Sequence, residues 1–253
     1  MELKGLAAVV TGGASGLGGT TAEMLANAGA KVAIFDVNAE AGEAHARRIG
    51  GLFAKTDVSS AANVAESLAV AEAAHGIARI LVNCAGVAPA MKTVGRDGQP
   101  HDLEVFRRAL EINLLGSFNM ISNFAARLIP AEPVGEERGV IVNTASVAAY
   151  EGQIGQAAYA ASKGGIVGLT VPVARDLAEH RIRVCTIAPG IFLTPMLMGL
   201  PQAAQDSLGK MIPHPSRLGK PEEYAQLVRA IVENPMLNGE TIRLDGAIRM
   251  SPR

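Results

Sequence analysis

Short apolar runs alternate with longer stretches of helical period along almost the whole chain. The apolar runs are rich in Val, Ile and Ala, and they predict strands at Ala7–Thr11, Lys31–Asp36, Gly51–Lys55, Arg79–Asn83, Gly139–Ala145, Ile182–Ala188 and Thr241–Asp245. The helical stretches between them are clearest at Leu17–Ala28, Ala61–His75, Leu103–Leu128, Ala157–Ala178 and Glu222–Asn234. Strands that alternate with helices indicate βαβ units, which place parallel strands beside one another in one sheet.

The pattern therefore predicts the α/β class: a Rossmann-type, doubly wound, three-layer sandwich with a seven-stranded parallel sheet between two layers of helices. At 253 residues, without a repeat or a linker, the chain fits a single domain spanning residues 1–253. The segment Val87–Asp102 has the composition of an inserted loop. The uncharged segment Val184–Gln205 is broken by prolines and glycines, so we interpret it as a strand followed by a mobile apolar loop rather than a membrane span.

Composition excludes some classes of function. The net charge of −1 gives no basis for expecting binding to nucleic acid or to a membrane surface. The five histidines do not pair at ligand spacing, so no metal site is expected. Cys84 and Cys185 belong to no Cys-x-x-Cys pair, and Met1–Gly5 leads directly into a strand without room for a targeting peptide. We therefore expect a reduced, cytoplasmic protein.

The first expected strand ends in a glycine-rich turn. Gly12, Gly16 and Gly18 form a Gly-x-x-x-Gly-x-Gly pattern before a helix. Glycines let the backbone approach a pyrophosphate, and the following helix N-terminus offers free N–H groups and a positive dipole end. A merely tight turn is the alternative, but the strand before the glycines and the helix after them favour a dinucleotide site.

Acidic residues follow the second and third expected strands. Asp36 stands where a carboxylate would bind the adenosine ribose hydroxyls, and it would repel a 2′-phosphate. Because the glycine turn and Val37 offer no cation, the sequence favours NAD over NADP. Asp57 and Val58 could meet the adenine, although a turn before Ser59 and Ser60 is also plausible.

Tyr159 and Lys163 are four residues apart on an expected helix, so they share one face, and Ser146 lies thirteen residues before the tyrosine. A lysine ammonium beside a phenol favours the phenolate. Lowering a tyrosine pKa from about 10 to about 7 requires roughly 4 kcal/mol, which one cation about 4 Å away supplies at an effective dielectric near 20. Tyr-x-x-x-Lys alone is a weak motif, and two ordinary surface residues are the alternative.

Together with Asn83–Gly86, Asn113 and Pro189–Gly190, these motifs resemble the short-chain dehydrogenase/reductase family. The resemblance implies an NAD site in the first half of the chain, up to about residue 145, and a catalytic and substrate-binding half after it. The implied cofactor-binding residues are Gly12, Ser15, Gly16, Leu17, Gly18, Asp36, Asp57, Val58, Cys84, Ala85, Gly86, Tyr159, Lys163, Pro189, Gly190, Phe192 and Thr194. Cys84 would contribute its backbone.

The resemblance also implies the chemistry. Tyr159 would act as general acid and base between a secondary alcohol and a ketone, and Lys163 would lower the phenol pKa and hold the nicotinamide ribose. Ser146 would bind the reacting oxygen of the substrate. Asn113 would disturb a long helix and bind a water molecule. The family further implies a homotetramer, formed through the helix bearing Tyr159 and the C-terminal helix–strand unit, with Gly164, Gly165 and Gly168 permitting close approach.

Segments from Val140 to Tyr159, from Pro215 to Gly219 and from Asn238 to Met250 are similar to one branch of the family. That branch interconverts L-3-hydroxyacyl-CoA and 3-ketoacyl-CoA and is also described as a group of 17β-hydroxysteroid dehydrogenases. A hydroxysteroid or short-alcohol dehydrogenase, a 3-oxoacyl-carrier-protein reductase and a non-catalytic scaffold remain alternatives.

A methionine-rich apolar cluster suits an acyl chain or a steroid, or packing on the core or another subunit: Phe192, Met196, Leu197, Met198, Leu200, Leu208, Met211 and Ile212. Five cations could meet CoA phosphates or stay solvated: Lys92, Arg96, Lys210, Arg217 and Lys220.

Overall fold

One parallel sheet forms the centre of the molecule. The computed structural model describes residues 1–252, apart from the side chain of Met196. In that part of the chain the strands are β1 (Ala7–Thr11), β2 (Lys31–Asp36), β3 (Leu52–Lys55), β4 (Ala78–Asn83), β5 (Gly139–Thr144), β6 (Ile182–Pro189) and β7 (Thr241–Leu244). Each strand boundary lies within one residue of the expectation, and the strand order β3-β2-β1-β4-β5-β6-β7, with all pairs parallel, confirms the doubly wound sheet.

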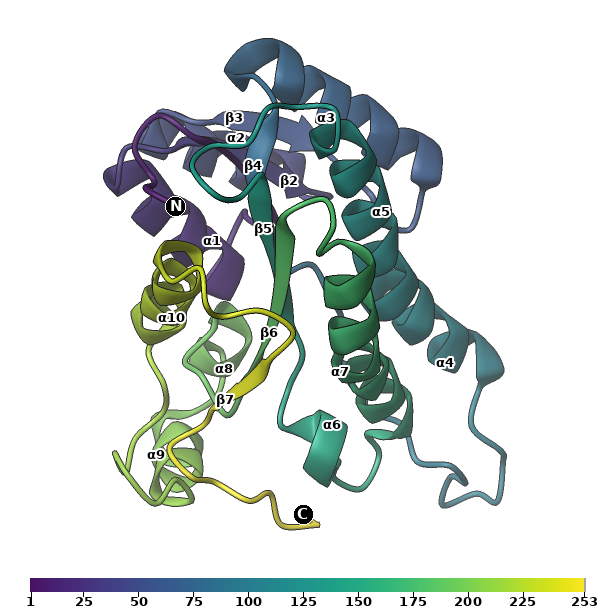
Figure 1. Cartoon of the computed structure of the whole chain (residues 1–253). Coiled ribbons are helices and arrows are strands. Elements are labelled where there is room, and N and C mark those ends of the chain that lie inside the picture. Colours follow the sequence, from purple (N-terminus) through teal and green to yellow (C-terminus); the bar gives the residue numbers. More distant parts are fainter. Residues whose placement is uncertain (253) are drawn as a thin grey trace.

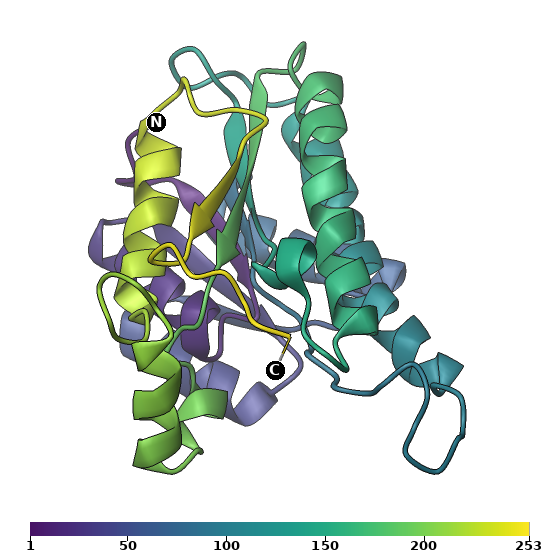
Figure 2. The same cartoon turned by 90° about the horizontal axis from the view of Figure 1, so that it is seen from below.

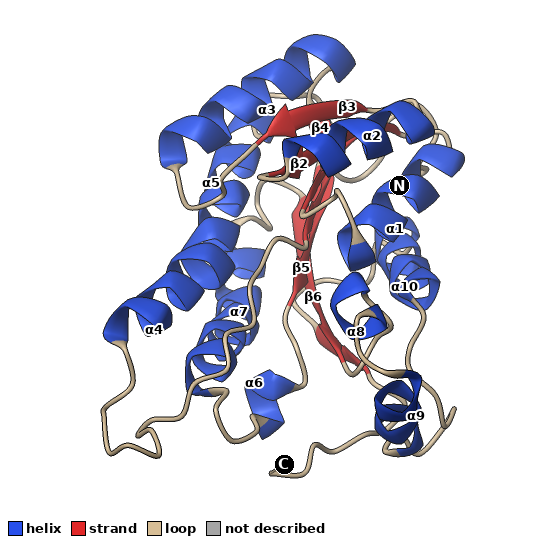
Figure 3. Cartoon of the chain, turned by 180° about the vertical axis from the view of Figure 1, so that it is seen from behind, coloured by secondary structure: helices blue, strands red, loops and turns tan. Residues whose placement is uncertain are grey.

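Helices cover both faces of this sheet (Figures 1 and 3). The longer ones are α1 (Gly16–Asn27), α2 (Ala39–Ile49), α3 (Ala61–His75), α4 (Leu103–Leu110), α5 (Gly116–Leu128), α7 (Ala157–Asp176), α9 (Gln202–Lys210) and α10 (Pro221–Glu233). The short ones are α6 (Ala148–Glu151), α8 (Pro195–Met198) and the π-helical turn η1 (Glu111–Leu115). The expected long helix from Leu103 to Leu128 is thus three consecutive segments. None of the helices described is long and apolar enough to cross a membrane.

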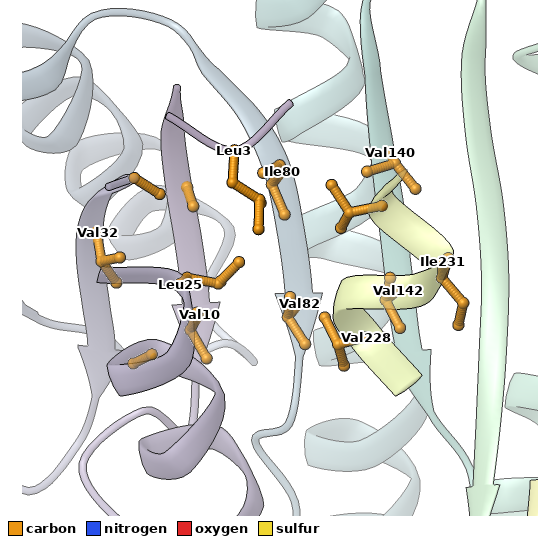
Figure 4. Close-up of a cluster of buried hydrophobic side chains, with 14 of the residues drawn as sticks. Leu3, Val10, Leu25, Val32, Ile80, Val82, Val140, Val142, Val228 and Ile231 are labelled. Atoms are coloured by element: carbon orange, nitrogen blue, oxygen red, sulfur yellow. The ribbon is translucent and has the colours of Figure 1, made fainter. Parts of the chain in front are cut away.

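Two buried apolar clusters hold the layers together. Alternate residues of each central strand point to opposite faces, so Val10, Val82 and Val142 pack against α1 and α10 (Figure 4). Leu81 and Ile141 belong to the opposite cluster, under α3, α5 and α7. Side chains at the carboxyl ends of the strands are thereby fixed by a core that is packed on both faces.

Two segments differ from the expectations. The chain after β6, expected as an apolar loop, contains the helices α8 and α9. Helix α2 was expected only as one of the helices between strands, without bounds; its N-cap is Asn38, whose side chain accepts from the Ala41 amide, and its C-cap is Gly50 in the left-handed conformation. The segment Val87–Asp102 is an irregular loop as expected, closed by a bridge between Val94 and Pro100.

Candidate active site

The carboxyl ends of the strands meet at one edge of the sheet, where the expected site residues gather. The strand order reverses between β1 and β4, because β1 connects onward to β2 on one side and lies beside β4 on the other. Ligands of doubly wound folds bind at such a switch point. Two adjoining cavities open there.

The larger cavity, called here the cofactor cavity, has a volume of about 860 Å³. Twelve of the expected cofactor-binding residues line it: Gly12, Ser15, Gly16, Leu17, Gly18, Asp36, Asp57, Val58, Cys84, Ala85, Gly86 and Thr194. These residues come from the ends of β1, β2, β3 and β4 and from the chain after β6, so the fold brings distant motifs to one place. Its size is within the range of small-molecule sites.

The glycine turn fits a dinucleotide for a steric reason. Gly12 and Gly16 have φ angles of 63° and 57°, a left-handed conformation that favours glycine. A Cβ atom on Gly18 would collide with the carbonyl oxygen of Gly12 and lie 3.1 Å from Cβ of Cys84. The turn is therefore closed tightly against β4, and the first turn of α1 presents its N–H groups to the cavity, as pyrophosphate binding requires.

The carboxylate of Asp36 is fixed by backbone groups. It accepts hydrogen bonds from the amides of Ala14 at 3.1 Å and Asn38 at 3.0 Å, on different oxygens. The neighbouring cavity residue Val37 is 62% exposed and uncharged. Asp57 lines the cavity as well, but its carboxylate also accepts from the backbone and hydroxyl of Ser59, at 3.0 and 2.6 Å. Both interpretations of Asp57, as a turn residue and as a cavity residue, thus fit its position.

The second cavity, called here the catalytic cavity, has a volume of about 410 Å³. Ser146, Tyr159 and Lys163 converge on it, and Pro189, Gly190, Phe192 and Thr194 line it too. It shares Leu17, Cys84, Gly86, Val87 and Thr194 with the cofactor cavity. A ligand that fills the larger cavity can therefore extend to the tyrosine and lysine.

Burial controls the ionisation of Tyr159 and Lys163. It raises the pKa of the Tyr159 phenol, and the hydrogen bond of Ser146 only partly opposes the increase. It also lowers the pKa of Lys163 from 10.5 to about 8. Burial thus outweighs any lowering of the Tyr159 pKa by Lys163, and that lowering stays a prediction. Lys163 Nζ lies 5.8 Å from the centre of the Tyr159 ring and donates instead to the carbonyl of Thr144 at 2.7 Å.

Asn113 lies in η1 and is fully buried, outside both cavities. Its side chain exchanges two hydrogen bonds with the backbone of Val87, both at 2.8 Å, and donates to the Ser162 hydroxyl at 2.9 Å. The expectation that Asn113 disturbs the helix is confirmed, because the helix widens to a π turn there. Asn113 thus ties the wall of the cavities at Val87 to helix α7.

Several residues of the catalytic cavity escaped the sequence analysis, among them Gln153, Gln156 and Met250. Gln156 stands three residues before Tyr159, a spacing that could have indicated it. Met250 offered no such signal. The C-terminal tail runs beside the segment between α6 and α7 (Figure 2), where Glu151 accepts from the Met250 amide at 3.1 Å and Ile154 donates to the Pro252 carbonyl at 3.0 Å.

The expected apolar cluster is only partly in the site. Phe192, Leu197 and Leu208 line the catalytic cavity, and Ile212 lines a smaller cavity beside it. Met198, Leu200 and Met211 are at least one-third exposed, and the side chain of Met196 lies outside the described residues. Among the expected cations, Arg217 is paired with Glu223 through contacts of 2.6 and 2.9 Å. No metal-binding group of His, Cys, Asp or Glu occurs within residues 1–252.

Comparisons with known proteins agree with this geometry. The chain is 56% identical to a human 3-hydroxyacyl-CoA dehydrogenase type-2, over 99% of this chain and 98% of the relative. A protein of the same name from Drosophila melanogaster is 51% identical over 99% and 100% of the two chains. The crystal structure of 3-hydroxyacyl-CoA dehydrogenase type-2 from Mycobacterium avium superposes with a TM-score of 0.95 at 41% identity, covering all of both chains.

These relatives belong to the branch that the sequence segments indicated, so the resemblance is confirmed. Members of the family use a nicotinamide dinucleotide, either NAD or NADP. The pattern of the family described as short chain dehydrogenase matches residues 6–205. This oxidoreductase chain belongs to the short chain dehydrogenase family.

Proposed function

We propose that the protein is an NAD-dependent dehydrogenase that interconverts L-3-hydroxyacyl-CoA and 3-ketoacyl-CoA. The observation that carries this proposal is the convergence of Ser146, Tyr159 and Lys163 on a cavity that shares a wall with the cofactor cavity. The full-length similarity to 3-hydroxyacyl-CoA dehydrogenases supports the choice of substrate class. In this scheme residues up to about 145 bind the dinucleotide, and residues 146–253 supply most of the catalytic cavity.

NAD is preferred to NADP because of Asp36. Its carboxylate is fixed in the cofactor cavity and would accept hydrogen bonds from ribose hydroxyls but repel a 2′-phosphate. When bound, the cofactor supplies or accepts the hydride.

Tyr159 exchanges the proton with the substrate oxygen. Burial raises its pKa, so the phenol is protonated at neutral pH and is ready to donate to the oxygen of a ketone. Ser146, which is 9% exposed, hydrogen-bonds the same substrate oxygen and stabilises the charge that develops on it. Lys163 contributes a positive charge beside the phenol, and its ammonium is held by the carbonyl of Thr144.

Assays of NADH oxidation test the substrate and the cofactor together. Acetoacetyl-CoA and longer 3-ketoacyl-CoAs should be reduced faster than a 17-ketosteroid or simple ketones, and NADH should exceed NADPH in kcat/KM. Faster turnover of the steroid, or a preference for NADPH, would refute the substrate or the cofactor assignment respectively. Exposed Lys92 and Arg96, on the loop before α4, are candidates to meet the CoA phosphates.

We also propose a homotetramer in the cytoplasm. Exposed apolar side chains gather on the outer helices, with Leu115 58%, Phe118 50% and Val171 41% exposed. A Cβ atom on Gly168 would meet nothing within 4 Å, so a partner helix could approach α7 there, whereas Gly165 is occupied within the chain by Leu114. The free thiols of Cys84 and Cys185 suit a reducing compartment. Light scattering with size exclusion should give a tetramer; a monomer, or a Phe118→Glu variant that stays tetrameric, would count against this interface.

A further inference from the structure

Helix α10 carries a tyrosine whose role the proposed chemistry does not use. Tyr224 is 0% exposed and is the largest of the fully buried side chains described. It lines neither the cofactor cavity nor the catalytic cavity. A buried phenol hydroxyl requires a hydrogen-bond partner, so the groups around its oxygen indicate what it does.

The hydroxyl of Tyr224 ends at the carboxyl edge of the sheet. Its oxygen lies 2.7 Å from Oγ1 of Thr144 and 3.6 Å from Sγ of Cys84. Oγ1 of Thr144 donates to the carbonyl of Asn83 at 2.6 Å. Because a threonine hydroxyl has one proton, which is then engaged with Asn83, Tyr224 must be the donor to Thr144. The hydrogen bonds therefore run in one direction, from α10 through β5 to β4.

Thr144 also holds the lysine of the candidate active site. Its carbonyl accepts from Lys163 Nζ at 2.7 Å. Thr144 lies one residue beyond the last β4–β5 pair, Asn83 with Asn143, so this carbonyl is free of the ladder between those strands. Thr144 is thus hydrogen-bonded through its side chain to Tyr224 and through its backbone carbonyl to Lys163.

We propose that Tyr224 is a positioning residue, which fixes Thr144 through its hydroxyl and thereby fixes the ammonium of Lys163. The proposal deepens the function proposed above and rests on the role given there to Lys163. Without the phenol hydroxyl, Oγ1 of Thr144 loses its partner at 2.7 Å and keeps only the carbonyl of Asn83 and, at 3.4 Å, the sulfur of Cys84. The end of β5 is then less strictly held, and the contact between Thr144 and Lys163 weakens.

A change in pH dependence follows from this arrangement. The titratable groups that face Lys163 are Tyr159 on α7 and Cys84 after β4, and Tyr224 lies behind Thr144. A hydrogen bond to the charged form of a group favours that form. Weakening the bond from Lys163 to Thr144 therefore lowers the lysine pKa further below its present value of about 8. Ketone reduction, which uses the charged lysine, is then lost at a lower pH.

The first test is Tyr224→Phe, which removes only the hydroxyl. We expect kcat for NADH and acetoacetyl-CoA to fall about 3- to 10-fold, with both KM values and the NADH dissociation constant within about twofold. The alkaline limb of the kcat profile should move about half a pH unit lower. Tyr150→Phe is the matched control, since Tyr150 is 49% exposed, and it should behave as the unmodified protein does.

Variants of Thr144 test the same link from its other side. Thr144→Val should lower kcat as Tyr224→Phe does, whereas Thr144→Ser should retain most of the wild-type kcat. The double variant Thr144→Val with Tyr224→Phe should have a kcat no lower than that of either single variant. Additive losses would overturn the proposal. So would a Tyr224→Phe protein that melts at a lower temperature but keeps its kcat and pH profile. If Tyr224→Phe does not fold, Thr144→Val with its Ser rescue decides.

A last measurement does not depend on turnover. The pKa of Lys163 can be followed by NMR on protein labelled with ¹³C at the lysine ε-carbon, with the signal assigned by its loss in Lys163→Arg. We expect a lower pKa in Tyr224→Phe and in Thr144→Val, but not in Tyr150→Phe. An unchanged pKa overturns the positioning role even if acetoacetyl-CoA is the correct substrate. An inactive wild type with the expected pKa change refutes only the proposed substrate.

Discussion

The two cavities of the site are formed by different kinds of chemical group. The cofactor cavity is formed largely by backbone: glycines that must lack a Cβ atom, and amides that fix the carboxylate of Asp36. The catalytic cavity depends on two side chains whose protonation is controlled by burial, Tyr159 and Lys163. Local backbone geometry can be recognised from spacing, whereas the protonation of a buried group depends on everything packed around it.

The largest expected effect separates the two cavities directly. Tyr159→Phe should lower kcat by about a thousandfold, because the proton donor to the substrate is lost, and should leave the NADH dissociation constant within about twofold. Stopped-flow or steady-state kinetics combined with calorimetric NADH binding makes the comparison. A variant that retains most of its rate would show that the phenol is not the proton donor.

Gly18→Ala should instead weaken NADH binding more than it lowers kcat. The added methyl group collides with the carbonyl of Gly12, so the turn must open and the pyrophosphate loses its contacts. Overpacking of this kind costs about 1–3 kcal/mol, or roughly a 5- to 150-fold loss of NADH affinity. The rate at saturating NADH should change much less. Circular dichroism and thermal melting serve as the check on folding, and wild-type affinity would mean that the turn does not hold the cofactor.

Asp36→Asn tests whether one charge sets the preference for NAD. The amide keeps an acceptor for the backbone of Ala14 or Asn38 but removes the repulsion of a 2′-phosphate. The ratio of kcat/KM for NADPH to that for NADH should rise about tenfold. Asp97→Asn, an exposed carboxylate in the loop before α4, is the control and should leave the ratio unchanged. If this ratio is unchanged in Asp36→Asn, the electrostatic explanation is refuted.

The smallest expected effect is the pH dependence of ketone reduction. The folded protein has a lysine pKa of about 8 at Lys163, below the ordinary 10.5, because burial disfavours the charge. Reduction should therefore decline as pH rises through about 8. Between pH values of about 8 and 10.5, Lys163 carries a proton in the unfolded chain but not in the folded protein. The free energy of unfolding should therefore rise with pH across this range. Reduction rates and denaturant titrations at several pH values check both directions of change. A reduction rate that declines only near pH 10.5 would contradict the effect of burial on Lys163.

Much of the fold was predictable because its signals are local. Strand ends followed the apolar runs closely, and the cofactor-cavity residues followed the glycine and aspartate spacing. The bounds of helix α2 were not predicted because its buried face carries Gly42 and His45 instead of a run of apolar side chains. The structure explains that glycine: a Cβ atom there would collide with the ring of Phe53, so packing on β3 decides against local propensity.

The electrostatics of the site could not be read from the sequence in the same way. The spacing of Tyr159 and Lys163 predicted a shared helix face, but burial outweighs the attraction between them. Tyr224 gave no signal either, since it lies on an amphipathic helix far along the chain. Only the packing of α10 against the sheet brings its hydroxyl to Thr144.

The π turn at η1 sets the rotational phase of the helix that follows it. One extra residue enters the turn, and each residue of an α-helix turns the chain by about 100°. The widened turn spreads the five residues Glu111–Leu115 over a rotation that a regular α-helix completes with about four, so it takes up the extra residue and α5 keeps its apolar face on the core. Phe124 and Met120 therefore point into the core, and the apolar side chain of Phe118 points outward. A single widened turn thus links the amide at Asn113 to the surface that α5 presents to solvent.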